Sequence, residues 1–181
     1  MAAGKKVMLA QGFSSMTVDV ILRETGVSRG AFYRRHPNLG HLAFSVIAEQ
    51  FGKGERIDTG SLAGDLLAIQ RADVAVFADP LMGNNLPALL ETSRADPAIY
   101  DLWVQGFAGP RRARVAAAIN AAIARGEIAE CAVDVAFLCD LLLGPLLARV
   151  LVPISGDIDD KLAQDSAGAA LSAVLGYPAR K

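Results

Sequence analysis

The residues best suited to chemistry in this sequence are a group of basic and aromatic side chains between positions 28 and 35, SRGAFYRR. Guanidinium groups fork onto guanine edges or pair with phosphates, and a tyrosine hydroxyl hydrogen-bonds a phosphate. A glycine leaves room where the backbone comes closest to a duplex. This chemistry indicates a reader of double-stranded DNA. The residues predicted to contact DNA are Thr17, Ser28, Arg29, Gly30, Tyr33, Arg34 and Arg35.

Two short helices joined by a tight turn would position these side chains. Thr17 is a favourable N-cap, and the apolar residues that follow it fall at i, i+3 and i+4, so the first helix has one apolar stripe to bury. Gly26 is expected to end that helix in the left-handed conformation, and Val27 to turn inward as a plug between the helices. Ser28 then caps the second helix.

The second helix is predicted to bury Ala31 and Phe32 and to leave its basic and tyrosine side chains on the outer face. Pro37 prevents its continuation, and Asn38 is the N-cap of the next helix. The pattern is therefore a helix-turn-helix, whose second helix fits a major groove.

At these residues the sequence resembles the TetR family of bacterial transcriptional repressors. The segment from Lys5 to Phe13 looks like the end of that family's first helix, and Ala121 to Pro153 is similar to its Arg-Gly-Glu turn and Gly-Pro-containing dimerisation helix. The resemblance implies an all-α fold, with an N-terminal three-helix helix-turn-helix domain before a larger helical ligand-binding and dimerisation domain. The residues that carry the family signature are Thr17-Val18, Gly26-Val27-Ser28, Arg29-Gly30 and Phe32-Tyr33.

Three departures from the family pattern bear on DNA affinity rather than on fold. The first helix is expected to lack its opening turn, because Met1 stands where the family is normally already helical. His36 occupies a position that usually holds a large apolar residue, and Leu39 replaces a frequent phosphate-contacting lysine.

Composition sets the outer limits. A chain of 181 residues with 52% hydrophobic content is long enough for a good core and excludes a disordered protein. Residues 1–50 carry six basic and three acidic residues, a net charge of +3, against −4 for the remainder. The asymmetry favours DNA at the N-terminal end. No secretory signal is evident, and a cytoplasmic protein is expected.

The predicted domain boundary falls at residue 38. Residues 1–38 form the DNA-binding domain, and residues 39–181 the effector-binding and dimerisation domain, entered through a linking helix over 39–53. Further helices are expected between proline and glycine breaks at Pro80, Asp96-Pro97, Gly109-Pro110 and Gly126. These helices are 61–78, 81–93, 97–107, 111–125, 133–152 and 158–175.

The last two helices are predicted to pair with their copies in a homodimer. Residues 135–152 are nearly all apolar, but Asp140, Arg149 and the internal Gly144-Pro145 argue against a membrane span. Helices 133–152 and 158–175 from each subunit would make a four-helix bundle. The alternative is that both helices are buried within a monomer. A dimer would place two recognition helices on a roughly palindromic operator.

The resemblance also implies a small-molecule effector, which would tilt the linking helix and release the DNA. Large apolar side chains of the middle helices suggest a largely hydrophobic effector, although most of these residues are expected to be ordinary core. Polar handles are available at Asn84, Asn85, Arg94 and Gln105. The candidate ligand-binding residues are Phe77, Met82, Leu86, Leu90, Trp103 and Phe107.

No catalytic, cofactor or metal motif accompanies these features. Cys131 and Cys139 are expected to be small buried hydrophobes, and His36 and His41 lack partners at ligand spacing. Acids such as Asp65, Asp73 and Glu91 are interpreted as parts of solvated helix faces. Two other readings stay open: a dimeric ligand-binding module with weakened DNA binding, and, more remotely, a small helical enzyme.

Overall fold

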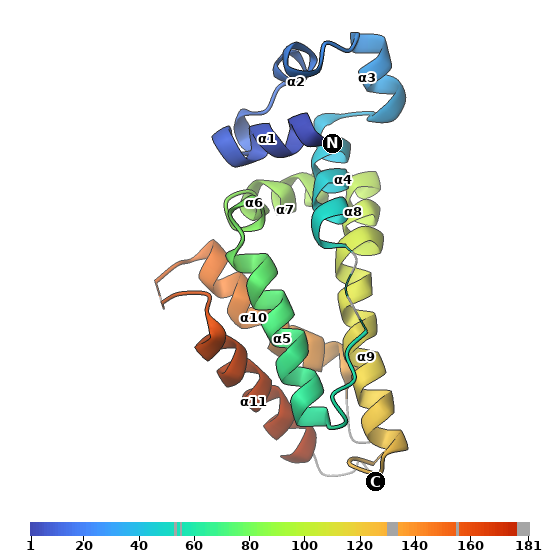
Figure 1. Ribbon diagram of the computed structural model, residues 1–181, viewed down its shortest axis with the longest axis vertical. Coiled ribbons are helices and arrows are strands. Elements are labelled where there is room, and N and C mark those ends of the chain that lie inside the picture. The colour runs from blue at the N-terminus through green and yellow to red at the C-terminus, as the bar shows by residue number, and fades with distance from the viewer. Residues whose placement is uncertain (53, 55, 130–133, 155, 177–181) are drawn as a thin grey trace. The chain divides into compact units, whose positions relative to one another are not determined.

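The computed structural model describes residues 1–52, 54, 56–129, 134–154 and 156–176 (Figure 1). Within these ranges the regular structure is helical and no strand occurs, which confirms the all-α class. The helices are α1 (Ala2–Gln11), η1 (Phe13–Ser15), α2 (Val18–Thr25), α3 (Arg29–Arg35), α4 (Leu39–Phe51), α5 (Leu62–Ala78), α6 (Pro80–Gly83), α7 (Leu86–Ala95), α8 (Pro97–Trp103), η2 (Val104–Ala108), α9 (Gly109–Ala124), α10 (Val135–Leu151) and α11 (Asp160–Gly176).

The chain divides into two compact units. The first comprises residues 1–54 and 79–110, and the second comprises the described residues of 55–78 and 111–181. The predicted DNA-binding domain, residues 1–38, thus shares a unit with α4 and with the segment from α6 to η2. The end of the predicted linking helix, Lys53, lies outside the described residues.

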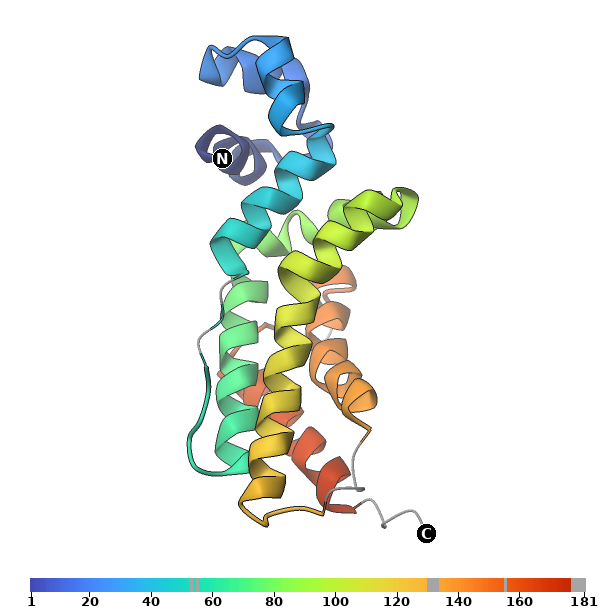
Figure 2. The same ribbon diagram turned by 90° about the vertical axis from the view of Figure 1, so that its right-hand side faces the viewer.

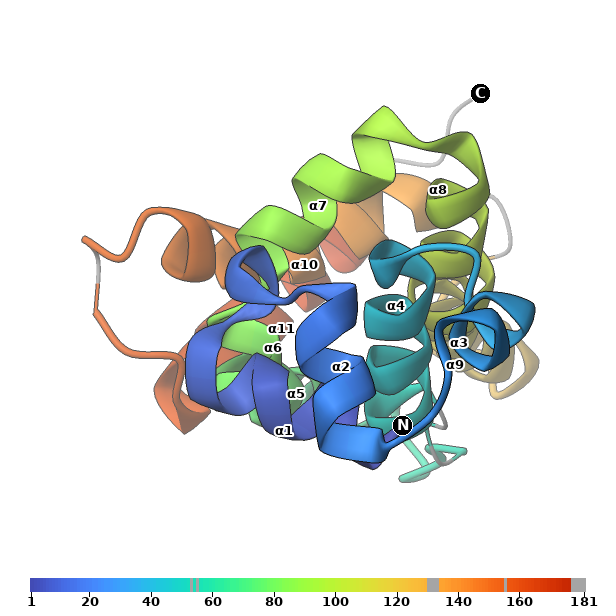
Figure 3. The ribbon, with the colours of Figure 1, turned by 90° about the horizontal axis from the view of Figure 1, so that it is seen from above.

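In the first unit, α4 is the central helix and packs against α1, α7, α8 and η2. Figure 3 shows α1 and α4 beside α2 and α3. The contact with α1 is close because Gly4 lies where a Cβ would come within 3.2 Å of Val46 and 3.3 Å of Leu42. Asn38 begins α4, its Oδ1 accepting a hydrogen bond from the His41 N–H at 2.8 Å, as the sequence predicts.

The predicted helix 81–93 is wrong as a single element, because the chain turns between α6 and α7. Asn85 is fully buried at this turn. Its Oδ1 accepts from the Phe13 N–H at 2.6 Å, and its Nδ2 donates to the carbonyls of Met8 at 3.2 Å and Leu81 at 2.9 Å. Asn85 therefore joins three segments of the first unit and is not available as a handle for a ligand.

The predicted break at Gly109-Pro110 is also wrong, because helix continues from α8 through η2 into α9. The η2 turn is a π turn, in which the Gly109 N–H donates to the Val104 carbonyl five residues earlier. A proline inside a regular α-helix clashes with the carbonyl four residues before it, here that of Gly106. The wide turn relieves this clash and aims the Gly106 carbonyl at Gly52, where a Cβ would lie 2.8 Å from its oxygen.

In the second unit, α5, α10 and α11 pack against one another, and α9 contributes to the same core (Figures 1 and 2). Buried alanines allow α11 to approach α5 closely. The core includes Leu66, Ile69, Ile119, Leu142, Ala167 and Ala170. The predicted helices 133–152 and 158–175 are observed as α10 and α11, while Cys131 and Val133 lie outside the described residues. Cys139 is buried, as expected.

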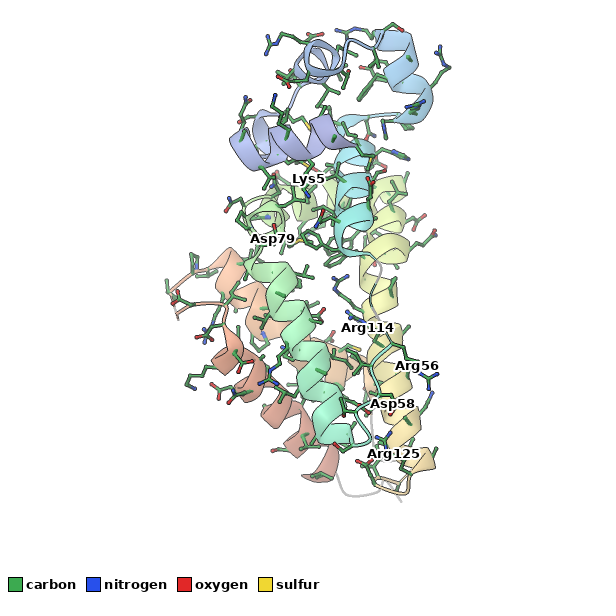
Figure 4. The ribbon with its side chains drawn as sticks, in the orientation of Figure 1. Lys5, Arg56, Asp58, Asp79, Arg114 and Arg125 are labelled. Carbon is green, nitrogen blue, oxygen red and sulfur yellow. The ribbon has the colours of Figure 1, made fainter. Side chains whose placement is uncertain are left out.

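Two acids predicted to be solvated are buried instead. Asp65 accepts a hydrogen bond from the Thr59 N–H at 2.6 Å and lies 3.3 Å from Arg125, which also reaches Asp58 at 3.7 Å (Figure 4). Asp73 is buried as well. The sequence pattern failed here because burial of these carboxylates depends on distant arginines, in α9 for Asp73 and directly after α9 for Asp65.

Candidate DNA-binding surface

Hydrogen bonds at the ends of α2 and α3 fix the helix-turn-helix, and they are those predicted from the sequence. Thr17 Oγ1 accepts from the Val20 N–H at 3.2 Å, and Ser28 Oγ accepts from the Ala31 N–H at 3.2 Å. Gly26 has φ 67°, the left-handed conformation that costs a residue without a Cβ little. Each helix of the motif thus starts and stops for a local reason.

The inner side of the motif is filled by Ile21 from α2 and Phe32 from α3, both almost completely buried. Val27, predicted as an inward plug, is 41% exposed, so that prediction is wrong. Val27 instead lines an open hollow that Ile21 and Phe32 also line. The Tyr33 ring stands edge-on to Phe32, with ring centroids 5.2 Å apart.

The outer face of α3 carries the residues predicted to contact DNA. Arg29, Gly30, Tyr33, Arg34 and Arg35 are all exposed, as are the capping residues of the two helices. Within the described part of the chain, neither Arg34 nor Arg35 forms an ion pair. Their charges are therefore available to a polyanion.

Gly30 has no packing role that the fold reveals. A Cβ at this position would meet only the end of the Arg34 side chain, at 3.8 Å. Glycine within a helix costs about 1 kcal/mol relative to alanine, and Gly30 does not need a positive φ. The absent side chain instead leaves the backbone of α3 open on its outer face, where a DNA backbone or base edge would approach.

Arg29 is already engaged in the absence of DNA, since its guanidinium forms an exposed ion pair with Asp19 of α2. Sequence reasoning missed Asp19. The signal was present, because both residues stand in the first turns of helices that the tight turn brings together. A second exposed pair, Lys6 with Glu24 at 2.5 Å, joins α1 to α2, and Lys6 lowers the pKa of the Glu24 carboxyl.

His36, immediately after α3, contacts His41 of α4. Their Nδ1 atoms are 3.2 Å apart, close enough for a hydrogen bond in which a protonated Nδ1 of one ring donates to an unprotonated Nδ1 of the other. Burial, followed by the neighbouring His41, lowers the pKa of His36. The junction between α3 and α4 therefore favours the neutral form of the His36 imidazole.

The candidate ligand-binding residues are divided between the two units. Phe77 belongs to the second, and the other five belong to the first. Within the first unit Trp103 stacks on Phe107 at 4.4 Å between ring centroids and meets Phe44 edge-on at 5.6 Å. The buried members of the set are Phe77, Met82, Leu86 and Phe107, whereas Leu90 and Trp103 are half-buried.

Both parts of the chain match known protein families. Residues 1–44 match the family described as bacterial regulatory proteins, tetR family. Residues 56–173 match the tetracyclin repressor-like C-terminal domain. The first match contains the helix-turn-helix, and the second extends from just before α5 into α11.

Relatives and solved structures agree with these matches. An uncharacterized HTH-type transcriptional regulator of Mycobacterium tuberculosis is 28% identical, over 84% of this chain and 75% of that protein. The uncharacterized HTH-type transcriptional regulator YdeS of Bacillus subtilis is 27% identical, over 91% of this chain and 82% of its own length. The TetR family transcription regulator SCO0332 has a similar structure, with TM-score 0.70 and 27% identity, over 94% of this chain and 93% of that one. A TetR transcriptional regulator from Agrobacterium tumefaciens shares the fold, with TM-score 0.69 and 17% identity, over 98% of this chain and 95% of that one.

Proposed function

Because this chain belongs to the TetR family of bacterial regulatory proteins, we propose that it is a ligand-responsive repressor, acting in the cytoplasm as a homodimer on a roughly palindromic operator. Its relatives are named as HTH-type transcriptional regulators, which points to a DNA-binding protein rather than an enzyme. Repression, effector binding and dimerisation are the proposed refinements of that role.

The main support for a DNA-binding role is the outer face of α3. It combines two arginines that form no ion pair with any described residue, an exposed tyrosine and a glycine with no internal packing role. Each feature suits binding to a DNA duplex. Arginine can donate two hydrogen bonds to a guanine edge, tyrosine can hydrogen-bond a phosphate, and glycine permits close approach of the helix backbone. No packing interaction within the motif accounts for Gly30 or for the arginines.

An exposed apolar surface on α10 and α11 supports a homodimer. Phe137 of α10 is 47% exposed and Leu175 of α11 is 63% exposed. The small residues Gly168 and Ser172 of α11 are also exposed, and nothing lies within 4 Å of a Cβ built at Gly168. A second copy of the chain would cover these side chains and would place two α3 helices about 34–36 Å apart.

The described helices, α10 included, all fall short of the length and apolar character that a bilayer-spanning segment needs. The exposed apolar surface of α10 is accordingly assigned in this proposal to contact with another subunit.

The test is selection of DNA from the source genome. Purified protein is incubated with fragmented genomic DNA at moderate salt, and the recovered fragments are sequenced. A repressor of this kind enriches a palindrome, and its affinity falls linearly with salt on logarithmic axes. If a folded, dimeric sample enriched no DNA sequence, the result would contradict the proposal and favour a dimeric ligand-binding module with weakened or lost DNA binding.

A matched pair of variants then localises the contact. Arg34→Ala is expected to weaken operator binding by about 1–3 kcal/mol and to relax the preference for one base pair. The control is Arg56→Ala, an exposed arginine in the segment before α5, labelled in Figure 4, which should leave DNA binding unchanged. Equal effects of the two substitutions would show that binding depends on overall charge rather than on α3.

A further inference from the structure

A hollow of about 320 Å³ lies within the first unit, where α1, α2, α3 and α4 come together (Figure 1). Its wall is formed by the start of α1, the end of α2 with the turn that follows it, α3, and the first turn of α4. Small-molecule sites in proteins have volumes of about 300–1,000 Å³. The hollow therefore has the size that a small ligand requires.

The inner wall of the hollow is apolar. Ile21 of α2, Phe32 of α3 and Leu42 of α4 line it and are almost completely buried, so they form its deepest part. Val27, in the turn between α2 and α3, also lines the hollow but is 41% exposed, and hence lies at its mouth. An apolar group that entered the hollow would remove the Val27 side chain from water, which is favourable.

The mouth of the hollow is positively charged. Arg34 and Arg35 of α3 line it and are exposed, and neither forms an ion pair within the described part of the chain. No acid is among the described residues that line the hollow. His36 lines it too, but burial lowers the pKa of this histidine, so the two arginines supply the charge at neutral pH. An apolar wall beside two such guanidinium groups complements a molecule with an apolar body and one anionic head.

We propose that this hollow binds a small amphipathic carboxylate, with its apolar body in the hollow and its carboxylate at Arg34 and Arg35. Arginine suits this head group because its planar fork donates two parallel hydrogen bonds to a carboxylate. The same two arginines are predicted to contact DNA, so the ligand and the DNA phosphates would compete for them. The binding site does not depend on the proposed function, and only this competition rests on it.

The experiment is isothermal titration calorimetry on the full chain with octanoate, with octanol, which lacks the charge, and with acetate, which lacks the apolar chain. Octanoate should bind at least about fivefold more tightly than octanol, because octanol accepts no charged hydrogen bond, and at least about tenfold more tightly than acetate, which buries little apolar surface. Equal binding of octanol would overturn the role of the arginines. Equal binding of acetate would overturn the role of the apolar wall, and no binding of octanoate would overturn the site.

A substitution at the mouth assigns the binding to the hollow. Val27→Glu should weaken octanoate binding at least about tenfold, because it replaces an apolar contact by a negative charge. Val27 is exposed, so the variant should fold, and thermal unfolding checks this. The matched control is Leu9→Glu, since Leu9 of α1 is 45% exposed and is not among the described residues that line the hollow. Octanoate binding that is unchanged in Val27→Glu, or equally weakened in Leu9→Glu, would overturn the assignment.

A second pair of variants tests the charge. Arg35→Gln should weaken octanoate binding by about fivefold and leave octanol binding unchanged. The control is Arg23→Gln, which removes the same charge from an exposed position of α2 outside the described lining of the hollow. Equal effects of the two substitutions would show that overall charge attracts the anion, and would overturn the proposal.

DNA binding separates this inference from the proposed function. Saturating octanoate should weaken operator binding at least about fivefold, and operator affinity that octanoate leaves unchanged would overturn the competition. If octanoate binding depends on Val27 but no operator is found, the ligand site stands and the repressor role fails. If an operator is found but octanoate does not bind, the repressor role stands and this inference fails.

Discussion

Gly30→Ala should stabilise the protein while weakening its hold on DNA. The added Cβ would meet only the mobile end of Arg34, at 3.8 Å, and Gly30 has no positive φ, so the fold accommodates alanine without strain. Alanine is favoured over glycine in helices by about 0.5–1 kcal/mol, and the second position of a seven-residue helix places the gain near the lower end. For a chain of this size the melting temperature should rise by about 1–3 °C.

The same methyl group should obstruct the approach of DNA to α3. Forcing an extra carbon into a close contact costs about 1–3 kcal/mol, which corresponds to roughly 5-fold to 150-fold weaker binding. Differential scanning fluorimetry measures the first effect, and fluorescence anisotropy with the selected operator measures the second. The rise in stability is the internal control that the variant is folded. Wild-type affinity in a stabilised Gly30→Ala protein would refute the assignment of α3 as the helix that lies closest to DNA.

Four further outcomes are expected. Tyr33→Phe should weaken binding to operator and to scrambled DNA alike by about 0.5–1.5 kcal/mol, and an anisotropy change confined to the operator would contradict a phosphate contact. Gly52→Ala should destabilise the protein to urea, because its Cβ would lie 2.8 Å from the Gly106 carbonyl oxygen, a backbone atom that cannot move away. The pKa of His36 is lower in the folded chain than its ordinary 6.5, so the unfolded chain binds this proton more readily. The free energy of unfolding should therefore fall as pH decreases below about 6.5. His36→Leu should reduce this pH dependence, measured by urea titrations at pH 8 and pH 5.5. Leu175→Glu should convert a dimer to a folded monomer in light scattering, whereas an unchanged mass would move the interface elsewhere.

Local features of the chain were predicted well because their causes are local. The caps at Thr17, Ser28 and Asn38 and the left-handed Gly26 depend on residues within one helical turn. The exposed face of α3 followed from the same spacing. The family resemblance, which rests on this motif and on the segment from Ala121 to Pro153, was confirmed by the matches to both parts of the chain.

Features that depend on distant residues were not predicted. The burial of Asp73 requires arginines 38 and 41 positions away, and no spacing in the sequence announces that pairing. The burial of Asn85 likewise depends on Met8, 77 residues earlier. The inward placement of Val27 was wrong as well, because apolar character alone does not determine whether a side chain in a turn packs inward.

Pro110 has a consequence for the wide turn that precedes it. A π turn holds one residue more than an α turn. In a helix without proline, the position of this additional residue can shift along the helix axis as backbone hydrogen bonds exchange partners one by one. Migration toward the C-terminus requires an N–H at every position, and Pro110 has none. The additional residue is therefore held in η2, where the Gly106 carbonyl oxygen would lie 2.8 Å from a Cβ at Gly52. Pro110, which the sequence pattern predicts as a helix break, thus fixes the position of the π turn within a continuous helix.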